Sequence, residues 1–243
     1  MPPSTKPPYD TELAQALAKV SMPTALTPEI LSTMRSMDLG SAEILKDQPL
    51  EHEEYFIPGP YGKIPISIIR PHGLEKKSDG RPCIFHIHGG GMIMGNRWTG
   101  MEEIIPWILE HGAVCITIQH RLAPEHKDPI PVQECYAGLK WAGEQLNELN
   151  INPSRLILMG TSAGGGLAAG VALMVRDHGG PELSALLLHC PMLDDRGTSI
   201  STHQFSNEGV WSKECNLFGW TALLGDRRAT DDVSIYAAPA RAK

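Results

Sequence analysis

A serine set between glycines, directly after an apolar run, constrains this chain more than any other feature. The stretch MGTSAGGGLAAG covers residues 159–170 and begins inside the apolar segment RLILMG. Gly160-Thr161-Ser162-Ala163-Gly164 fits the G-x-S-x-G pattern, in which a tight turn from strand to helix exposes a serine hydroxyl above a sheet. Such a turn is crowded, so Gly160 and Gly164 must lack side chains. The pattern predicts Ser162 as a nucleophile.

The segments around this turn alternate between short apolar strands and longer helical patterns. Strands are predicted at EEYFIPG, IPISIIRP, PCIFHIH, AVCITIQ, RLILMG and SALLLHC. Helices are predicted around Ile104 to Glu110, from Val132 to Leu149 and directly after Ser162. This alternation is typical of a mostly parallel sheet with helices on both faces, so the predicted fold class is α/β.

Further helical patterns precede and interrupt this alternation. An apolar repeat from Leu13 to Val20 predicts one amphipathic helix, and TPEILSTMRSM, with Thr27 as its N-cap, predicts a second. From Thr198 to about Leu224 the rhythm breaks, and three aromatic residues are spaced like one face of a helix: Trp211, Phe218 and Trp220. That spacing fits ordinary packing as well as a lid over a substrate.

A second glycine-rich stretch, HIHGGGMIMG, ends another predicted strand. Here His88 is followed by Gly89, Gly90 and Gly91, the type of loop whose unhindered backbone N–H groups point into an acyl-transfer site. With the N–H of Ala163, these amides would hold the oxyanion of a tetrahedral intermediate, each donor contributing roughly a hundredfold or more in rate. The two motifs together predict acyl transfer at Ser162.

These motifs resemble those of the hormone-sensitive lipase family of α/β-hydrolases. The stretches that match are HGGG, HRLAPEH (120–126), KWA (140–142), GTSAGGGLAAG, CPMLDDR (190–196) and YAAPARA (236–242). The resemblance covers nearly the whole chain from about Glu53. It implies an α/β-hydrolase fold with a helical cap and a serine esterase that cleaves short-chain or aryl carboxylic esters without a metal or organic cofactor. One departure is Gln119-His120, where the family often has an acidic residue and tyrosine.

The same resemblance implies a division of the chain into four regions. Residues 1–50 correspond to an N-terminal cap segment and residues 51–197 to the hydrolase core. Residues 198–228 correspond to a second cap segment, and residues 229–243 lead back toward later strands of the core.

The histidine and the acid that would act with Ser162 are not part of these two motifs. In this family the triad runs serine, acid, histidine along the chain, and a segment like YAAPARA lies shortly before the strand that delivers the acid. Because the sequence ends at Lys243, the resemblance implies that the last strands, the acid and the histidine are missing, which would leave this chain weak or inactive. Internal substitutes would be His189 with Asp194 or Asp195, near the carboxyl end of a strand. The alternative is that His189 is a core residue and that the aspartates pin the cap.

Composition argues against several other classes of protein. The net charge is −7 and the basic residues are scattered, which disfavours nucleic acid as a partner. No stretch approaches the roughly 18 consecutive apolar residues of a membrane span. The start MPPSTKPPYD lacks the pattern of a secretory signal, and the 5 cysteines are widely spaced, which is typical of reduced thiols. We therefore expect a cytoplasmic protein.

Three alternatives compete with the hydrolase. His86 and His88 alternate on a strand and could face a metal, but no third ligand follows at a recognisable spacing. A dinucleotide site is disfavoured because Ser162 stands where that fingerprint needs a glycine. The third alternative is a hydrolase fold that has lost catalysis and persists as a small-molecule binding protein or a remnant. The sequence leaves the oligomeric state open.

Overall fold

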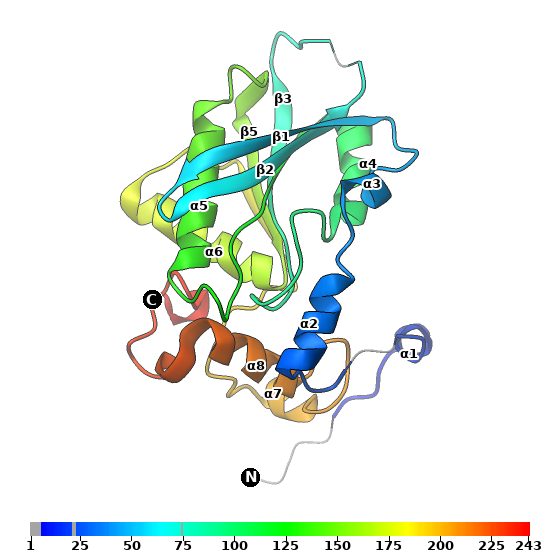
Figure 1. The fold of residues 1–243 in the computed structure, drawn as a ribbon, viewed down its shortest axis with the longest axis vertical. Coiled ribbons are helices and arrows are strands. Elements are labelled where there is room, and N and C mark those ends of the chain that lie inside the picture. Colours follow the sequence, from blue (N-terminus) through cyan, green and yellow to red (C-terminus); the bar gives the residue numbers. More distant parts are fainter. Residues whose placement is uncertain (1–5, 21–22, 74) are drawn as a thin grey trace.

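A six-stranded sheet organises the computed structural model, which describes residues 6–20, 23–73 and 75–243 (Figure 1). Its strands are β1 (Leu50–Gly59), β2 (Gly62–Pro71), β3 (Arg81–Ile87), β4 (Val114–Ile118), β5 (Ile151–Thr161) and β6 (Ala185–His189). Their order across the sheet is β1-β2-β4-β3-β5-β6. The strands β1 and β2 pair antiparallel, as do β2 and β4, whereas β4, β3, β5 and β6 run parallel. The predicted α/β class with a mostly parallel sheet is confirmed.

Helices cover both faces of this sheet, because successive residues of a strand point to opposite sides. On β5, Leu158 belongs to the core beneath α5 (Ile130–Glu144) and α6 (Ala163–His178), and the adjacent Met159 belongs to the core beneath α4 (Met101–His111). The central strands β3 and β4 are buried on both sides, which explains their nearly continuous apolar sequences. The helix predicted to run to Leu149 ends at Glu144, since residues 145–150 form turns.

The N-terminal segment holds α1 (Thr11–Leu17), α2 (Pro28–Ser36) and α3 (Ser41–Ile44). The predicted N-cap is confirmed, because the hydroxyl of Thr27 accepts a hydrogen bond from the N–H of Ile30 at 3.3 Å. The first amphipathic helix is shorter than its apolar repeat suggests. It buries no residue, and Leu13 is 65% exposed. Helical periodicity gave the helix there, but none of its residues is buried.

The second helical segment contains α7 (Ile200–Gln204) and α8 (Lys213–Leu224), followed by the short turns η1 (Gly225–Arg227) and η2 (Pro239–Arg241). Figure 1 shows α2, α7 and α8 together beyond one end of the sheet. Hydrogen bonds join the two distant segments, from the hydroxyl of Ser212 to the carbonyl of Thr24 at 2.6 Å and from Cys215 Sγ to the carbonyl of Pro23 at 3.4 Å. Trp220 is 1% exposed and belongs to the main core.

A buried ion pair attaches the C-terminal residues to the core. The side chain of Asp195 is fully buried and accepts two hydrogen bonds from Arg241, at 2.7 and 2.9 Å, and one from the N–H of Ala229 at 2.6 Å. Burial alone would raise the pKa of Asp195, but these hydrogen bonds outweigh it and hold the pKa below its ordinary value. The neighbouring Asp194 instead pairs with Arg196 at the surface.

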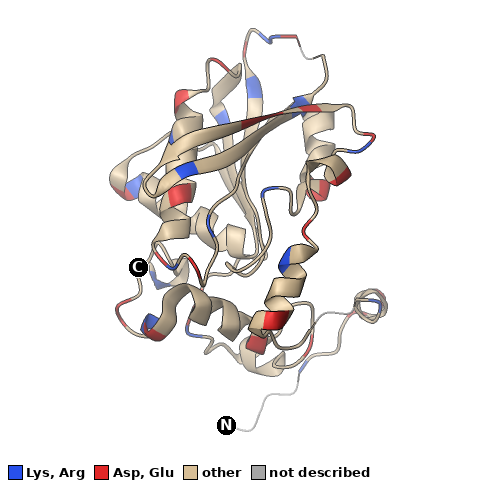
Figure 2. Cartoon of the chain, in the orientation of Figure 1, with Lys and Arg blue, Asp and Glu red and all other residues tan. Residues whose placement is uncertain are grey.

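The surface carries both signs of charge. Lys and Arg are interspersed with Asp and Glu over the visible elements rather than gathered in one stripe (Figure 2). Within the described part of the chain, no helix is long and apolar enough to cross a membrane.

The buried pair at Asp195 predicts a specific loss of stability. We expect Asp195→Asn to lower the free energy of unfolding by about 3 kcal/mol, because it leaves the guanidinium of Arg241 largely buried without a counter-charge. Urea denaturation followed by circular dichroism measures this change. Asp194→Asn is the matched control, since it breaks an exposed pair one residue away and should leave the denaturation midpoint nearly unchanged. Equal midpoints for the two variants would contradict the anchoring role of Asp195.

Candidate active site

Ser162 occupies the tight turn between β5 and α6, where the sequence predicted it. Its backbone has φ 56° and ψ −117°, a strained conformation for a residue with a side chain. Three backbone hydrogen bonds hold it. Its N–H donates to the carbonyl of His189 at 2.8 Å, and its carbonyl accepts from the N–H groups of Gly166 and Met192 at 3.0 and 2.9 Å. The helix α6 and the end of β6 therefore fix the position of Ser162 together.

The glycines on either side of Ser162 are required by close backbone approach. A Cβ on Gly160 would lie 2.1 Å from the carbonyl oxygen of Gly164. A Cβ on Gly164 would lie 2.1 Å from the carbonyl oxygen of Ile87 and 2.4 Å from that of His88. No real side chain tolerates such contacts. The first turn of α6 thus rests directly on the end of β3, which continues into the glycine loop, residues 89–91.

The glycine loop lies against Ser162. A Cβ on Gly89 would come within 2.9 Å of the carbonyl oxygen of Thr161 and 3.6 Å of the Cβ of Ser162. Gly90 and Gly91 have φ of 113° and 61°, in the region that favours glycine. Among the described residues, none of these three glycines is the donor in a backbone hydrogen bond of the loop. Their N–H groups are therefore available to a ligand.

The start of α6 adds a further donor. Ala163 is the first residue of the helix, so its N–H has no acceptor within the helix, and the helix dipole places partial positive charge there. Free N–H groups from two elements thus gather around Ser162. Such an arrangement suits stabilisation of negative charge that develops on an oxygen beside the serine.

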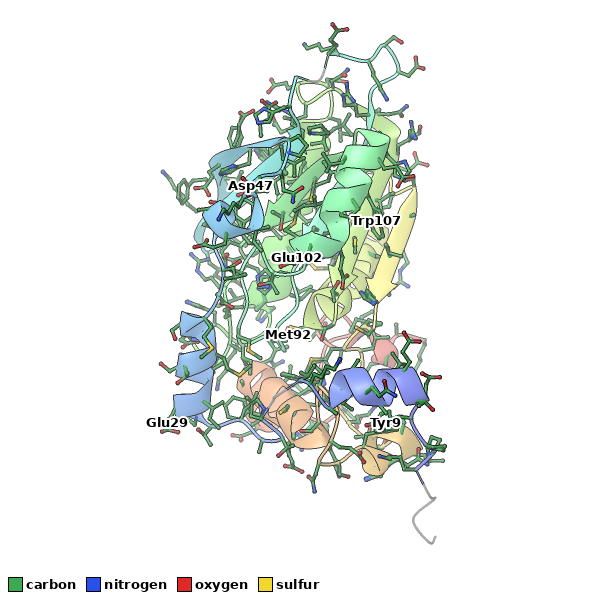
Figure 3. All side chains as sticks on the ribbon, turned by 90° about the vertical axis from the view of Figure 1, so that its right-hand side faces the viewer. Tyr9, Glu29, Asp47, Met92, Glu102 and Trp107 are labelled. Atoms are coloured by element: carbon green, nitrogen blue, oxygen red, sulfur yellow. The ribbon has the colours of Figure 1, made fainter. Side chains whose placement is uncertain are left out.

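The helices α2, α7 and α8, with the residues that join α7 to α8, form a helical layer that also reaches this loop. A Cβ on Gly91 would lie 2.3 Å from the ring of Trp211, and a Cβ on Gly219 of α8 would lie 2.6 Å from the carbonyl oxygen of Gly91. Figure 3 shows Met92, the residue after the glycines, where the sheet meets the helical layer. One of the three aromatic residues singled out in the sequence, Trp211, therefore packs on the glycine loop.

The residues considered as an internal acid and base do not come together. His189 is exposed, and its Nδ1 lies 3.1 Å from Oε2 of Glu103 on α4. Asp194 and Asp195 pair with Arg196 and Arg241 instead. Among the described residues, the hydroxyl of Ser162 has no hydrogen-bond partner. Sequence reasoning missed Glu103, because only the fold brings α4 beside the end of β6.

Three buried histidines surround the base of the glycine loop. His86 lies 3.1 Å from the hydroxyl of Thr117, His88 is 2.8 Å from the carbonyl of Gly89, and His120 is 2.9 Å from the carbonyl of Arg121, each through Nδ1. Burial lowers the pKa of all three, that of His86 to about 4. All three rings are therefore neutral at pH 7. The described residues contain no group of three or more His, Cys, Asp or Glu side chains that could hold a metal.

The chain resembles known esterases in sequence. The profile of the family described as alpha/beta hydrolase fold matches residues 84–243. The carboxylesterase NlhH of Mycobacterium tuberculosis is 36% identical over 132 residues, which are 53% of this chain and 39% of that protein. Bovine arylacetamide deacetylase is 33% identical over 180 residues, 71% of this chain and 44% of that protein. The matches thus span less than half the length of these relatives.

Solved structures give the same likeness over more of the chain. A bacterial heroin esterase is 32% identical and superposes with a TM-score of 0.85, covering 96% of this chain and 75% of the esterase. A hyperthermophilic esterase from Pyrobaculum calidifontis is 26% identical with a TM-score of 0.81, covering 97% of this chain and 75% of that one.

The contact at Gly164 predicts that the turn tolerates no side chain. We expect Gly164→Ala to lower the free energy of unfolding by about 3 kcal/mol, since its methyl group would overlap two backbone carbonyls that cannot move independently. Gly180→Ala is the control, because it places a methyl group at an exposed position beside one valine side chain and should change the free energy by less than about 0.5 kcal/mol. Urea denaturation measures both, and a fully stable Gly164→Ala would refute the crowded turn.

The buried histidines predict acid sensitivity. Above pH 6.5 they are neutral whether the chain is folded or unfolded, so they contribute no pH dependence. Below pH 6.5 these histidines take up protons in the unfolded chain but stay neutral in the folded chain. The free energy of unfolding therefore decreases as the pH decreases. With a folded pKa of about 4, His86 alone should lower the free energy of unfolding by about 2 kcal/mol between pH 7.5 and 5.0. Urea midpoints at these pH values test this. His86→Leu should show a shallower slope, and an equal slope would contradict the assignment.

Proposed function

Since the chain belongs to the hormone-sensitive lipase-like family of α/β-hydrolases, we propose that it acts on carboxylic esters through an acyl-enzyme formed at Ser162. The observation that carries this proposal is the strained Ser162 beside the unpaired N–H groups of the glycine loop. A binding site alone gives no reason to hold a serine in an unfavourable conformation next to free donors. An acyl-transfer site does, because it needs the nucleophile and the oxyanion donors in fixed positions.

The chemistry assigns one task to each group. The hydroxyl oxygen of Ser162 attacks the ester carbonyl and loses its proton, while the carbonyl oxygen becomes the oxyanion. The N–H groups of Gly89, Gly90, Gly91 and Ala163 are the candidate donors to that oxyanion. The intermediate collapses with cleavage of the bond to the alcohol, which leaves with a proton. Water then attacks the acyl-enzyme and releases the acid.

The four regions expected from the sequence fit this proposal. We assign residues 51–197 to the hydrolase core, and residues 1–50 and 198–228 to a cap that covers the site. Two contacts support the assignment, because the two cap segments bond to each other at Ser212 and the second one packs on Gly91 through Trp211. Residues 229–243 are held to the core through Asp195. The cap would then choose the ester, for which short-chain and aryl esters are our proposal.

One observation favours a second candidate. The hydroxyl of Ser162 has no hydrogen-bonded base among the described residues, and the ring of His189 is paired with Glu103. A serine without a base keeps only the catalysis that the oxyanion donors and binding supply, about 10³–10⁴ over water. The second candidate is therefore a protein that binds small esters and does not turn them over.

Acetylation of Ser162 by p-nitrophenyl acetate distinguishes the two. We expect the folded 243-residue chain to gain one acetyl group by intact mass, with slow release of p-nitrophenolate, and Ser162→Ala to show neither. His189→Ala is the matched control and should acetylate at the rate of the parent chain. A loss of rate in His189→Ala would identify it as the base. A folded chain that binds the ester but is never acetylated would favour the binding protein.

A further inference from the structure

His120 has a place at the site that the proposed chemistry does not use. It follows β4, it is 2% exposed, and its ring lies parallel to that of His88, with 4.2 Å between centroids and 5° between planes. His88 is the residue directly before the glycine loop. Among the described residues neither ring forms a hydrogen bond with the hydroxyl of Ser162.

Hydrogen bonds select the same tautomer on both rings. Nδ1 of His88 faces the carbonyl of Gly89 at 2.8 Å, and Nδ1 of His120 faces the carbonyl of Arg121 at 2.9 Å. A carbonyl oxygen only accepts, so each Nδ1 carries the proton. Within the described residues neither Nε2 has a partner. The stack therefore joins two neutral rings, and the ring of His88, which donates to the carbonyl of Gly89, packs face to face on His120.

The segment after β4 also contacts the residues that follow the glycine loop. The N–H of Ala123 donates to the carbonyl of Met92 at 2.9 Å. Arg35 of α2 bridges the same two segments, from Nε to the carbonyl of Ile93 at 2.6 Å and from one terminal nitrogen to the carbonyl of Ala123 at 2.8 Å. Residues 120–123 thus contact both sides of the loop.

The loop needs such support because of its backbone. Gly90, Gly91 and Met92 have φ of 113°, 61° and 69°, three consecutive residues outside the ordinary regions. A conformation of this kind persists only where its surroundings determine it. Oxyanion donors must in turn stay within about 0.5 Å of their productive positions to be effective.

We propose that His120 is a positioning residue, which orients the ring of His88 by stacking and so fixes the carbonyl of Gly89 and the N–H groups that follow it. The proposal rests on the proposed function of Ser162.

A p-nitrophenyl alkylphosphonate tests the proposal, because it modifies serine once and needs no turnover. The Ser162 oxygen bonds to phosphorus, the bond to p-nitrophenolate breaks, and the serine proton passes to solvent. The maximal labelling rate and the half-saturating concentration are measured at pH 8. We expect His120→Ala to lower the maximal rate about tenfold or more, as misplaced catalytic groups do, with a half-saturating concentration within about twofold of the parent.

Rescue separates positioning from general stability. His120→Phe keeps an aromatic ring on His88 and should recover most of the labelling rate. His86→Ala is the matched control, since it removes an equally buried histidine that bonds Thr117 and does not stack on His88. It should lose stability while labelling at close to the parent rate. His120→Gln, which is polar but has no aromatic ring, replaces His120→Ala if that variant fails to fold.

Each outcome decides the proposal. Equal maximal rates for the folded parent and His120→Ala, or the His120→Gln that replaces it, overturn it. A rate for His120→Phe as low as that of the variant without a ring also overturns it, because stacking would then not be the cause. No phosphonate on Ser162 of the folded parent chain, with Ser162→Ala as the blank, contradicts the proposed function and this inference with it.

Discussion

The approach of one helix to one strand end is the constraint on which the site depends. The helix α6 can begin at Ala163 only because Gly164 has no side chain, which allows its backbone to touch the carbonyl oxygens of Ile87 and His88. That single contact brings the turn after β5 and the loop after β3 together. Two motifs about 70 residues apart thus meet without any side chain between them, as parallel strands β3 and β5 end at the same edge.

Support for the glycine loop comes from outside the sheet. Trp211 and Gly219 of the helical layer pack on Gly91, and Arg35 bonds the carbonyl of Ile93. The residues that follow α8 are attached to the core by Asp195, whose buried charge is compensated by Arg241. A buried ion pair gives little net stability, but removing one partner leaves an uncompensated buried charge. Its role here is to define where residues 229–243 lie against the core.

The sequence predicted features that depend on backbone geometry, because glycine spacing and apolar runs record local conformation. The sheet, the helices on both faces and the N-cap at Thr27 all follow from such local patterns. Contacts between residues that are far apart in the chain leave no pattern in the sequence. The stack of His120 on His88 and the contact of His189 with Glu103 are examples. The first predicted helix is present, but none of its residues is buried, because burial depends on what the fold places opposite a helix.

The position of Ser162, the proposed nucleophile, does not depend on the group that would remove its proton. The three hydrogen bonds that hold Ser162 come from backbone atoms of His189, Gly166 and Met192, and its hydroxyl takes no part in them. The proposed oxyanion donors are backbone N–H groups too. Orientation and charge stabilisation are therefore built into the path of the main chain, so they persist whatever side chain supplies the proton transfer. In the proposed mechanism the two contributions to acyl transfer are therefore separable, and the described residues supply the first.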